Sequence, residues 1–271
     1  MKRITSTALP VPTDQTAIPA PKLTFGTQKV TTSFPTGGMF SSGSIKFNLN
    51  NVQMVELAKK AFTENSVFKD TPGAMETFLL CLSITSAFEA GFDGINTYDK
   101  AGVSVGFIQL ARPEGGVGKL LELVGKPELA AKVKTAFGIA DPHSSPAALT
   151  ARFNTALLKE LVLATSGPDG IKAQFAMAIN KNIGGQNYFD KAYAKFKELG
   201  LTDDLSAAML FDAAVNMGAG SVKNFKTPVA GQTDGDWIAA SINLFSRPER
   251  RTGGHARTAF RCLGRSGEKN G

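Results

Sequence analysis

The chain has 271 residues, of which 42% are hydrophobic and 20% are charged, so it carries enough apolar material for a sizeable core and is not a wholly disordered protein. Its two cysteines, Cys81 and Cys262, exclude a disulfide framework and a thiolate-rich zinc site, and we expect both to be free, buried thiols. No apolar run of about eighteen residues is present, and the net charge of +7 is concentrated near the C-terminus. We therefore expect no membrane span and no standard secretory signal.

The first 50 residues differ in composition from the rest, because Thr, Ser, Pro and Gly dominate them. Apolar residues are scattered among them, as at 23–25 and 45–47, so we predict an irregular N-terminal arm over 1–50 that is disordered or forms one or two short strands. From Val52 onward the apolar spacing is helical, and 51–271 is predicted to form one mainly α domain. The helices are expected near 52–64, 72–90, 116–124, 127–137, 146–165, 170–181, 187–198, 203–217 and 234–246.

The helix predicted over 72–90 ends on a carboxylate. Asp70 or Thr71 can cap it, Pro72 suits its first position, and its apolar stripe, continued by two turns, reaches Glu89. Apolar packing and the negative end of the helix dipole both disfavour a charged carboxylate, so the pKa of Glu89 is predicted to be raised. A carboxylic acid that keeps its proton near neutral pH is what a glycosidase uses to protonate a leaving oxygen. The plain alternative is that the helix ends earlier and Glu89 points into water.

Two further segments stand out in chain order. The glycines and β-branched residues of 91–110 predict a loop with a short hairpin between helices, the kind of ordered loop that often carries function. In the segment 203–217, Asp203 and Asp204 favour a helix start, and Gly218 can end the helix in a left-handed conformation. Asn216 then falls in the last turn, where its amide could bind a sugar oxygen or satisfy loop carbonyls.

The tail from Arg247 to Gly271 holds six arginines and one lysine against two glutamates, a net charge of +5. Such a tail can bind nucleic acid, anionic lipid or the anionic polymers of a bacterial wall, or it can be a solvated terminus. It lacks interleaved aromatic residues and Arg-Gly repeats, so nucleic acid ranks low among these partners. The two histidines, His143 and His255, are far apart and have no metal-ligand spacing, so neither a metal site nor a cofactor is expected.

The order of two motifs suggests a family. Glu89-Ala90-Gly91-Phe92, followed by Gly106-Phe107-Ile108-Gln109-Leu110, resembles the catalytic segment of the lysozyme superfamily, in which the acid ends a helix and a hairpin follows. Downstream, the stretch 210–222 with Asn216, Gly218 and Gly220 resembles the Asn-x-Gly-x-Gly junction of phage-type muramidases and lytic transglycosylases. The resemblance covers these two patches only. It departs from the usual pattern at Ala90, where Ser is common, and at Val215, where Tyr is common.

The resemblance implies a lysozyme-like domain of mainly α (α+β) class, with a short hairpin beside a sugar cleft. It implies a glycosidase that cleaves the β-1,4 bond between N-acetylmuramic acid and N-acetylglucosamine in peptidoglycan. Glu89 would be the general acid, Asp99 the second carboxylate and Ser104 an orienter of the attacking water, while Tyr98, Gln109 and Asn216 would contact the substrate. Asp93 competes with Asp99, and sequence spacing does not decide between them.

Other functions remain open at this point. The departures at Ala90 and Val215 are compatible with a catalytically inert virion or injected protein that has a lysozyme fold. A chitinase or chitosanase of the same superfamily is a second, enzymatic alternative. A nucleic-acid binder using the basic tail is the third alternative. If the protein is a bacteriolytic, endolysin-type enzyme, we expect it to be synthesised in the cytoplasm. A holin, a phage particle or a secretion machine would deliver it to the wall, and the N-terminal arm could engage that carrier.

Overall fold

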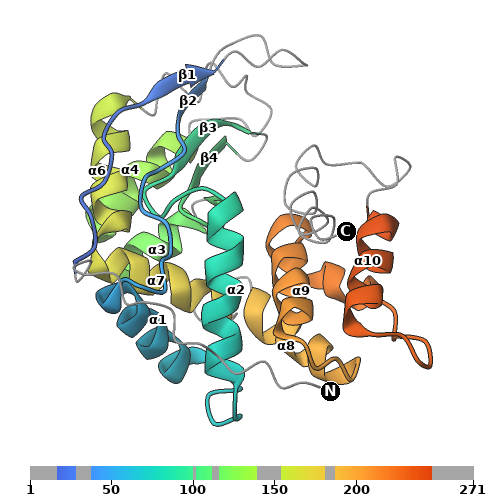
Figure 1. Cartoon of the computed structure of the whole chain (residues 1–271). Coiled ribbons are helices and arrows are strands. Elements are labelled where there is room, and N and C mark those ends of the chain that lie inside the picture. Colours follow the sequence, from blue (N-terminus) through green and yellow to red (C-terminus); the bar gives the residue numbers. More distant parts are fainter. Residues whose placement is uncertain are drawn as a thin grey trace.

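The computed structural model describes residues 17–28, 38–99, 102–111, 116–138, 154–180 and 187–245. Within them the protein is mainly helical with one small antiparallel sheet, which confirms the predicted class (Figure 1). Helix α2 stands in the middle, between the sheet with α3, α4 and α6 on one side and α8, α9 and α10 on the other (Figure 1).

The sheet joins the N-terminal arm to the predicted hairpin. Its strands run antiparallel in the order β1-β2-β3-β4-β5, with Ser41 opposite Ile95 where the arm meets the hairpin. Their bounds are β1 Gly26–Gln28, β2 Gly38–Ser41, β3 Ile95–Asp99, β4 Gly102–Val105 and β5 Leu110–Ala111. The described part of the arm is therefore packed into the same unit as the helices.

The arm contains two short strands, β1 and β2, in agreement with the prediction. Neither strand includes the apolar groups at 23–25 and 45–47, because strand pairing depends on a partner that is distant in sequence. Residues 45–47 join no ladder. Ile45 and Phe47 are buried in the core, and the carbonyl of Ile45 accepts a hydrogen bond from the N–H of Phe92.

The helices agree closely with the predicted periodicity. Asn51 caps the first of them by accepting a hydrogen bond from the N–H of Met54, and Asp203 caps α9 by accepting one from the N–H of Leu205. Their bounds are α1 Val52–Asn65, α2 Ala74–Phe88, α3 Val117–Leu123, α4 Pro127–Gly138, α6 Thr155–Ser166, α7 Pro168–Ile179, α8 Tyr188–Glu198, α9 Asp204–Met217 and α10 Asp234–Phe245, with a 3-10 turn η2 at Ala219–Asn224.

Two helix starts differ from the prediction. Pro72 does not open α2, because Gly73, with a φ of +80°, forms the N-cap after a turn in which Ala74 N–H bonds to the Thr71 carbonyl. The helix predicted from 146 begins as α6 at Thr155, since Asn154 is extended and caps it. The segment 139–153 lies outside the described residues.

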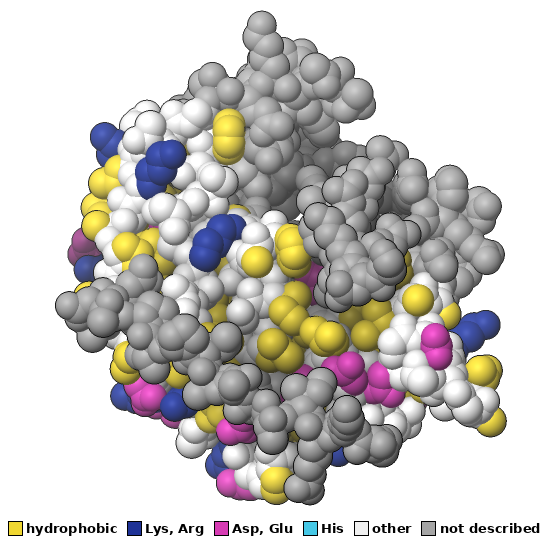
Figure 2. All heavy atoms as spheres, viewed as in Figure 1, with side chains coloured by type: hydrophobic (Ala, Val, Ile, Leu, Met, Phe, Trp, Pro, Cys, Tyr) yellow, Lys and Arg dark blue, Asp and Glu magenta, His cyan; other side chains and the backbone are white. Residues whose placement is uncertain are grey.

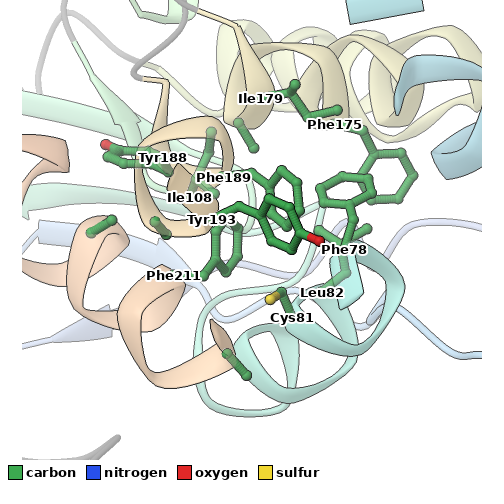
Figure 3. Packing of buried hydrophobic residues seen from close by; sticks show 14 of the residues in the cluster. Phe78, Cys81, Leu82, Ile108, Phe175, Ile179, Tyr188, Phe189, Tyr193 and Phe211 are labelled. Atoms are coloured by element: carbon green, nitrogen blue, oxygen red, sulfur yellow. The ribbon is translucent and has the colours of Figure 1, made fainter. Parts of the chain in front are cut away.

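Aromatic rings from several helices pack against one another in the core (Figure 3). Phe189 of α8 contacts Phe78 of α2 with a centroid separation of 4.9 Å, stacks on Tyr193 at 5.5 Å and meets Phe62 of α1 at 5.7 Å. It also meets Phe211 of α9 at 6.2 Å. A second cluster lies between the sheet and α3, α4 and α6 and includes Ile95, Val103, Val105, Val117, Leu121, Val133, Leu158, Leu161 and Val162.

Cys81 lies in α2 and is a free, buried thiol, as predicted, and burial raises its pKa well above the usual value. Cys262 and the basic tail lie outside the described residues. Among the described helices, none combines the length and apolar character that crossing a membrane requires.

Candidate functional site

Glu89 lies where the sequence predicts it, at the end of α2. It is the C-cap residue, its N–H donates to the Thr85 carbonyl at 3.0 Å, and its side chain is half-buried. Thr85 and Glu89 are one turn apart and so share a side of the helix. A half-buried carboxyl can be reached from solvent while much of its surroundings is protein.

Lys46 supports the end of α2 from the arm. Its ammonium donates a hydrogen bond to the backbone carbonyl of Glu89, and the flanking residues Ile45 and Phe47 anchor it in the core. Burial lowers the pKa of Lys46, and the nearby carboxylates of Glu89 and Asp93 partly offset that effect. Lys46 therefore places a positive charge next to Glu89.

Asp93 braces the loop that follows Glu89. Its carboxylate is 0% exposed and accepts hydrogen bonds from the N–H groups of Lys22 at 3.0 Å, Ser44 at 2.7 Å and Ile45 at 2.8 Å, and from the Ser44 hydroxyl at 2.9 Å. These donors come from the N-terminal arm. This placement favours a structural role for Asp93 over that of a second catalytic carboxylate.

Gly91 permits the close approach between loop and arm. A Cβ at this position would lie 2.8 Å from Oδ1 of Asp93 and 2.9 Å from the carbonyl oxygen of Ile45. The N–H of Gly91 donates to the carbonyl of Ser42 at 2.8 Å. The chain after Glu89 is thereby held against the arm by backbone contacts that a larger residue would break.

Helix α9 brings a second carboxyl to Glu89. Asp212 is only 3% exposed, and no described residue forms a well-oriented hydrogen bond with either of its side-chain oxygens. Burial, and then the negative charge of Glu89, raise the pKa of Asp212 to about 7. The Thr85 hydroxyl and the Asn216 amide lie close enough to offset that rise in part.

Asn216 lies one turn beyond Asp212, as the sequence predicts. Its Nδ2 donates to the backbone carbonyl of Asp212 at 3.1 Å, and Gly218, with a φ of +86°, ends the helix. The structure thus brings together Glu89, Asp212 and Asn216, from α2 and α9. Sequence reasoning missed Asp212, although a carboxylate between Phe211 and Ala213 on a buried helix was a signal.

The hairpin holds Ser104 and Gln109 next to each other. Oε1 of Gln109 accepts hydrogen bonds from the Ser104 hydroxyl at 2.8 Å and from Nδ2 of Asn96 at 2.7 Å, while its Nε2 donates to the Gly106 carbonyl at 2.9 Å. Gln109 adopts a positive φ of 50°. These two predicted site residues are therefore bound to the hairpin itself.

Tyr98 and Asp99 belong to the last part of β3, where Asp99 lies opposite Gly102. Their side chains lie outside the described part of the structure, so their predicted roles stay predictions.

A surface pocket of about 660 Å³ lies between α4 and α6, away from these residues. Its lining includes Lys132 and Glu160, which form an ion pair at 2.9 Å. Within the ranges that the structure describes, no group of three His, Cys, Asp or Glu side chains could hold a metal ion.

Comparisons of the chain with protein-family models, with curated proteins and with solved structures find no match.

Proposed function

We propose that the protein is a peptidoglycan-cleaving glycosidase with a lysozyme-like domain, in which Glu89 protonates the leaving oxygen of the β-1,4 bond between N-acetylmuramic acid and N-acetylglucosamine. The observation that carries the proposal is the half-buried position of Glu89 at the end of α2, near enough to the buried Asp212 of α9 for the two carboxyl groups to interact electrostatically. Asn216 lies one turn further along α9. The two motifs that resemble the lysozyme superfamily thus meet in space.

The chemistry follows from this placement. Protonated Glu89 donates to the glycosidic oxygen as the bond breaks, and positive charge develops at the anomeric carbon. Asp99 or a positioned water completes the substitution. Ser104 is only 1% exposed and bonds to Gln109, so the two side chains would support the hairpin beside the substrate. The chain needs no cofactor for this reaction.

The face around α2 and α9 suits a saccharide. Hydrophobic side chains gather over these two helices (Figure 2), and Phe88, directly before Glu89, is 37% exposed. Sugar rings present apolar faces to such side chains and hydroxyls to nearby polar groups.

The basic tail and the N-terminal arm would bring the enzyme to its substrate. The basic tail would raise the local concentration of the enzyme on an anionic wall, and added salt should weaken that effect. A holin, a phage particle or a secretion machine would deliver the protein, with the N-terminal arm as the segment that such a carrier engages.

The test compares wild type with Glu89→Gln on purified peptidoglycan, by loss of turbidity and by mass spectrometry of the released muropeptides. We expect clearing by the wild type and a loss of about 100-fold or more in Glu89→Gln, because the general acid is gone. Glu76→Gln is the matched control, since Glu76 lies exposed in the first turn of the same helix.

The other outcomes of this test are also informative. Wild-type protein that clears no wall contradicts the proposal and favours an inert lysozyme-fold component. Cleavage of soluble chitooligosaccharides without wall clearing favours a chitinase or chitosanase. A salt-sensitive shift of DNA that disappears on removal of the tail, in protein that clears no wall, favours the nucleic-acid binder.

A further inference from the structure

We propose that Asp212 is a positioning residue for the Glu89 proton: the two carboxyl groups share one proton, and Asp212 keeps it next to Glu89 in the resting protein. The inference deepens the proposed function and rests on it for its catalytic meaning. The coupling of the two carboxyls can be tested without any activity.

The surroundings of Asp212 strongly disfavour its charge. It is 3% exposed, it lies on a helix whose neighbouring side chains Phe211 and Ala213 are fully buried, and both its oxygens lack a well-oriented donor among the described residues. A buried carboxylate that has neither a well-oriented donor nor a cationic partner is strongly disfavoured in its charged form. Asp212 is therefore the member of the pair that holds a proton.

The surroundings of Glu89 permit charge on the other member. Its side chain is only half-buried, and the ammonium of Lys46 lies close enough for the two charges to interact. The C-terminal end of α2 acts in the opposite direction. The resting pair therefore carries its proton on Asp212 and its negative charge on Glu89, and the two groups titrate together.

Other groups around Asp212 do not replace Glu89 in this role. Cys81 of α2 interacts electrostatically with Asp212. Burial raises the pKa of the Cys81 thiol well above its usual value, so the thiol stays neutral. Helix α8 turns Tyr188 and Tyr193 inward; burial raises both their pKa values, that of Tyr188 to about 12.

Several charged side chains near α9 have partners of their own. Asp190 of α8 accepts hydrogen bonds from Ser66 and Val67, and Lys195 pairs with Glu198 at 2.7 Å. Asp204, in the first turn of α9, accepts a hydrogen bond from the Thr77 hydroxyl at 2.7 Å.

The sharing supplies the acid when it is needed. A saccharide that covers Glu89 removes water from its carboxylate and so favours transfer of the proton from Asp212 to Glu89. Glu89 then gives that proton to the leaving oxygen. The attacking water adds its hydroxyl to the anomeric carbon and returns one proton to the pair, so the cycle is balanced.

The deciding experiment is a carbon-13 titration of the side-chain carboxyls in the full chain, for wild type and Glu89→Gln. We expect Asp212 to titrate near neutral pH in wild type, and Glu89→Gln to lower its midpoint by about half a pH unit or more, because the neighbouring charge is removed. An unchanged midpoint overturns the inference, whether or not the protein cleaves peptidoglycan.

The second measurement is the pH profile of kcat/KM for wall cleavage. Asp212→Asn is expected to move the alkaline limb to lower pH, because Glu89 then loses its proton without a neighbouring carboxylate to retain it. Asp190→Asn is the control, because Asp190 is also a buried carboxyl and accepts a hydrogen bond from Ser66. This variant should leave the alkaline limb of the pH profile unchanged. If Asp212→Asn does not fold, the Glu89→Gln titration still decides.

Failure of the two proposals can be told apart. Coupled titration in a protein that cleaves no glycan leaves the shared proton in place and refutes the glycosidase. Glycan cleavage by Glu89 with independent titration of the two carboxyls keeps the glycosidase and refutes the shared proton.

Discussion

Asp212 and Lys46 set the electrostatics around Glu89 from opposite sides. Asp212 is buried and has no well-oriented donor among the described residues, while Lys46 reaches the end of α2 from a segment that precedes α1. One side chain raises the cost of negative charge near Glu89 and the other lowers it. The balance is therefore sensitive to single substitutions at either position.

Asp212 should make the stability of the protein depend on pH. Its folded-state pKa of about 7 lies above the ordinary 3.8, so the folded chain binds a proton that the unfolded chain releases. That contribution to stability is complete below about pH 4 and is lost as the pH rises through about 7. We expect the free energy of unfolding of Asp212→Asn, relative to wild type, to rise between pH 4 and pH 8 by at most about 4 kcal/mol. Urea unfolding at both pH values measures this, and a pH-independent difference would contradict it.

Lys46→Met should raise the proton affinity of the carboxyl pair. The substitution keeps the apolar stem but removes the ammonium that favours ionised Glu89 and bonds to its carbonyl. We expect the titration of Glu89 and Asp212 to move to higher pH and the protein to lose about 1 kcal/mol of stability. Lys119→Met is the control, because Lys119 forms an exposed pair with Glu122. Identical titrations in the two variants would refute the role of Lys46.

The ends of α2 and α9 and the loop after Glu89 form one junction. The N-terminal arm contributes Lys46 and the donors to Asp93, and Gly91 lets the arm and the loop touch through their backbones. The position of Glu89 thus depends on contacts between elements, and the helix alone does not fix it.

Gly91→Ala should disturb this junction. The added Cβ would meet the carboxylate of Asp93 and the backbone of Ile45 at under 3 Å, so the loop must shift. We expect a loss of about 1–3 kcal/mol in stability, together with reduced wall clearing. Gly235→Ala, at an exposed position of α10, has nothing closer than 3.8 Å to the new Cβ and should behave as wild type. Equal melting temperatures and activities in both variants would contradict the tight contact.

Sequence reasoning predicted well what is local. Caps such as Asn51 and Asp203, together with apolar spacing, located most helices within two or three residues, and Glu89 and Asn216 lie at the helix ends where expected. It failed where partners are distant in the chain. The positions of the arm strands were not predicted, because β2 depends on pairing with β3. Asp212 was missed, because its environment arises only when α9 packs on α2.

At the scale of the whole molecule, Phe189 of α8 is the ring that contacts helices α1, α2 and α9 together. Phe189→Ala should cost about 3–5 kcal/mol, since the cavity would open at the centre of the packed rings. Denaturant unfolding measures the loss. Leu163→Ala, at an exposed position of α6, is the control and should change stability by less than about 0.5 kcal/mol. A similar small loss in both would show that the aromatic cluster is not the main support.

The contact of Lys22, Ser44 and Lys46 with the residues around Glu89 gives the N-terminal arm a structural task. A protease cut just ahead of Asn51 that releases the arm would remove these three residues together with the buried side chains of Ile45 and Phe47. The clipped protein is expected to be less stable and to lose its activity. Limited proteolysis would then act as an irreversible off-switch, and a shortened recombinant version that starts at the first helix would be inactive for the same reason.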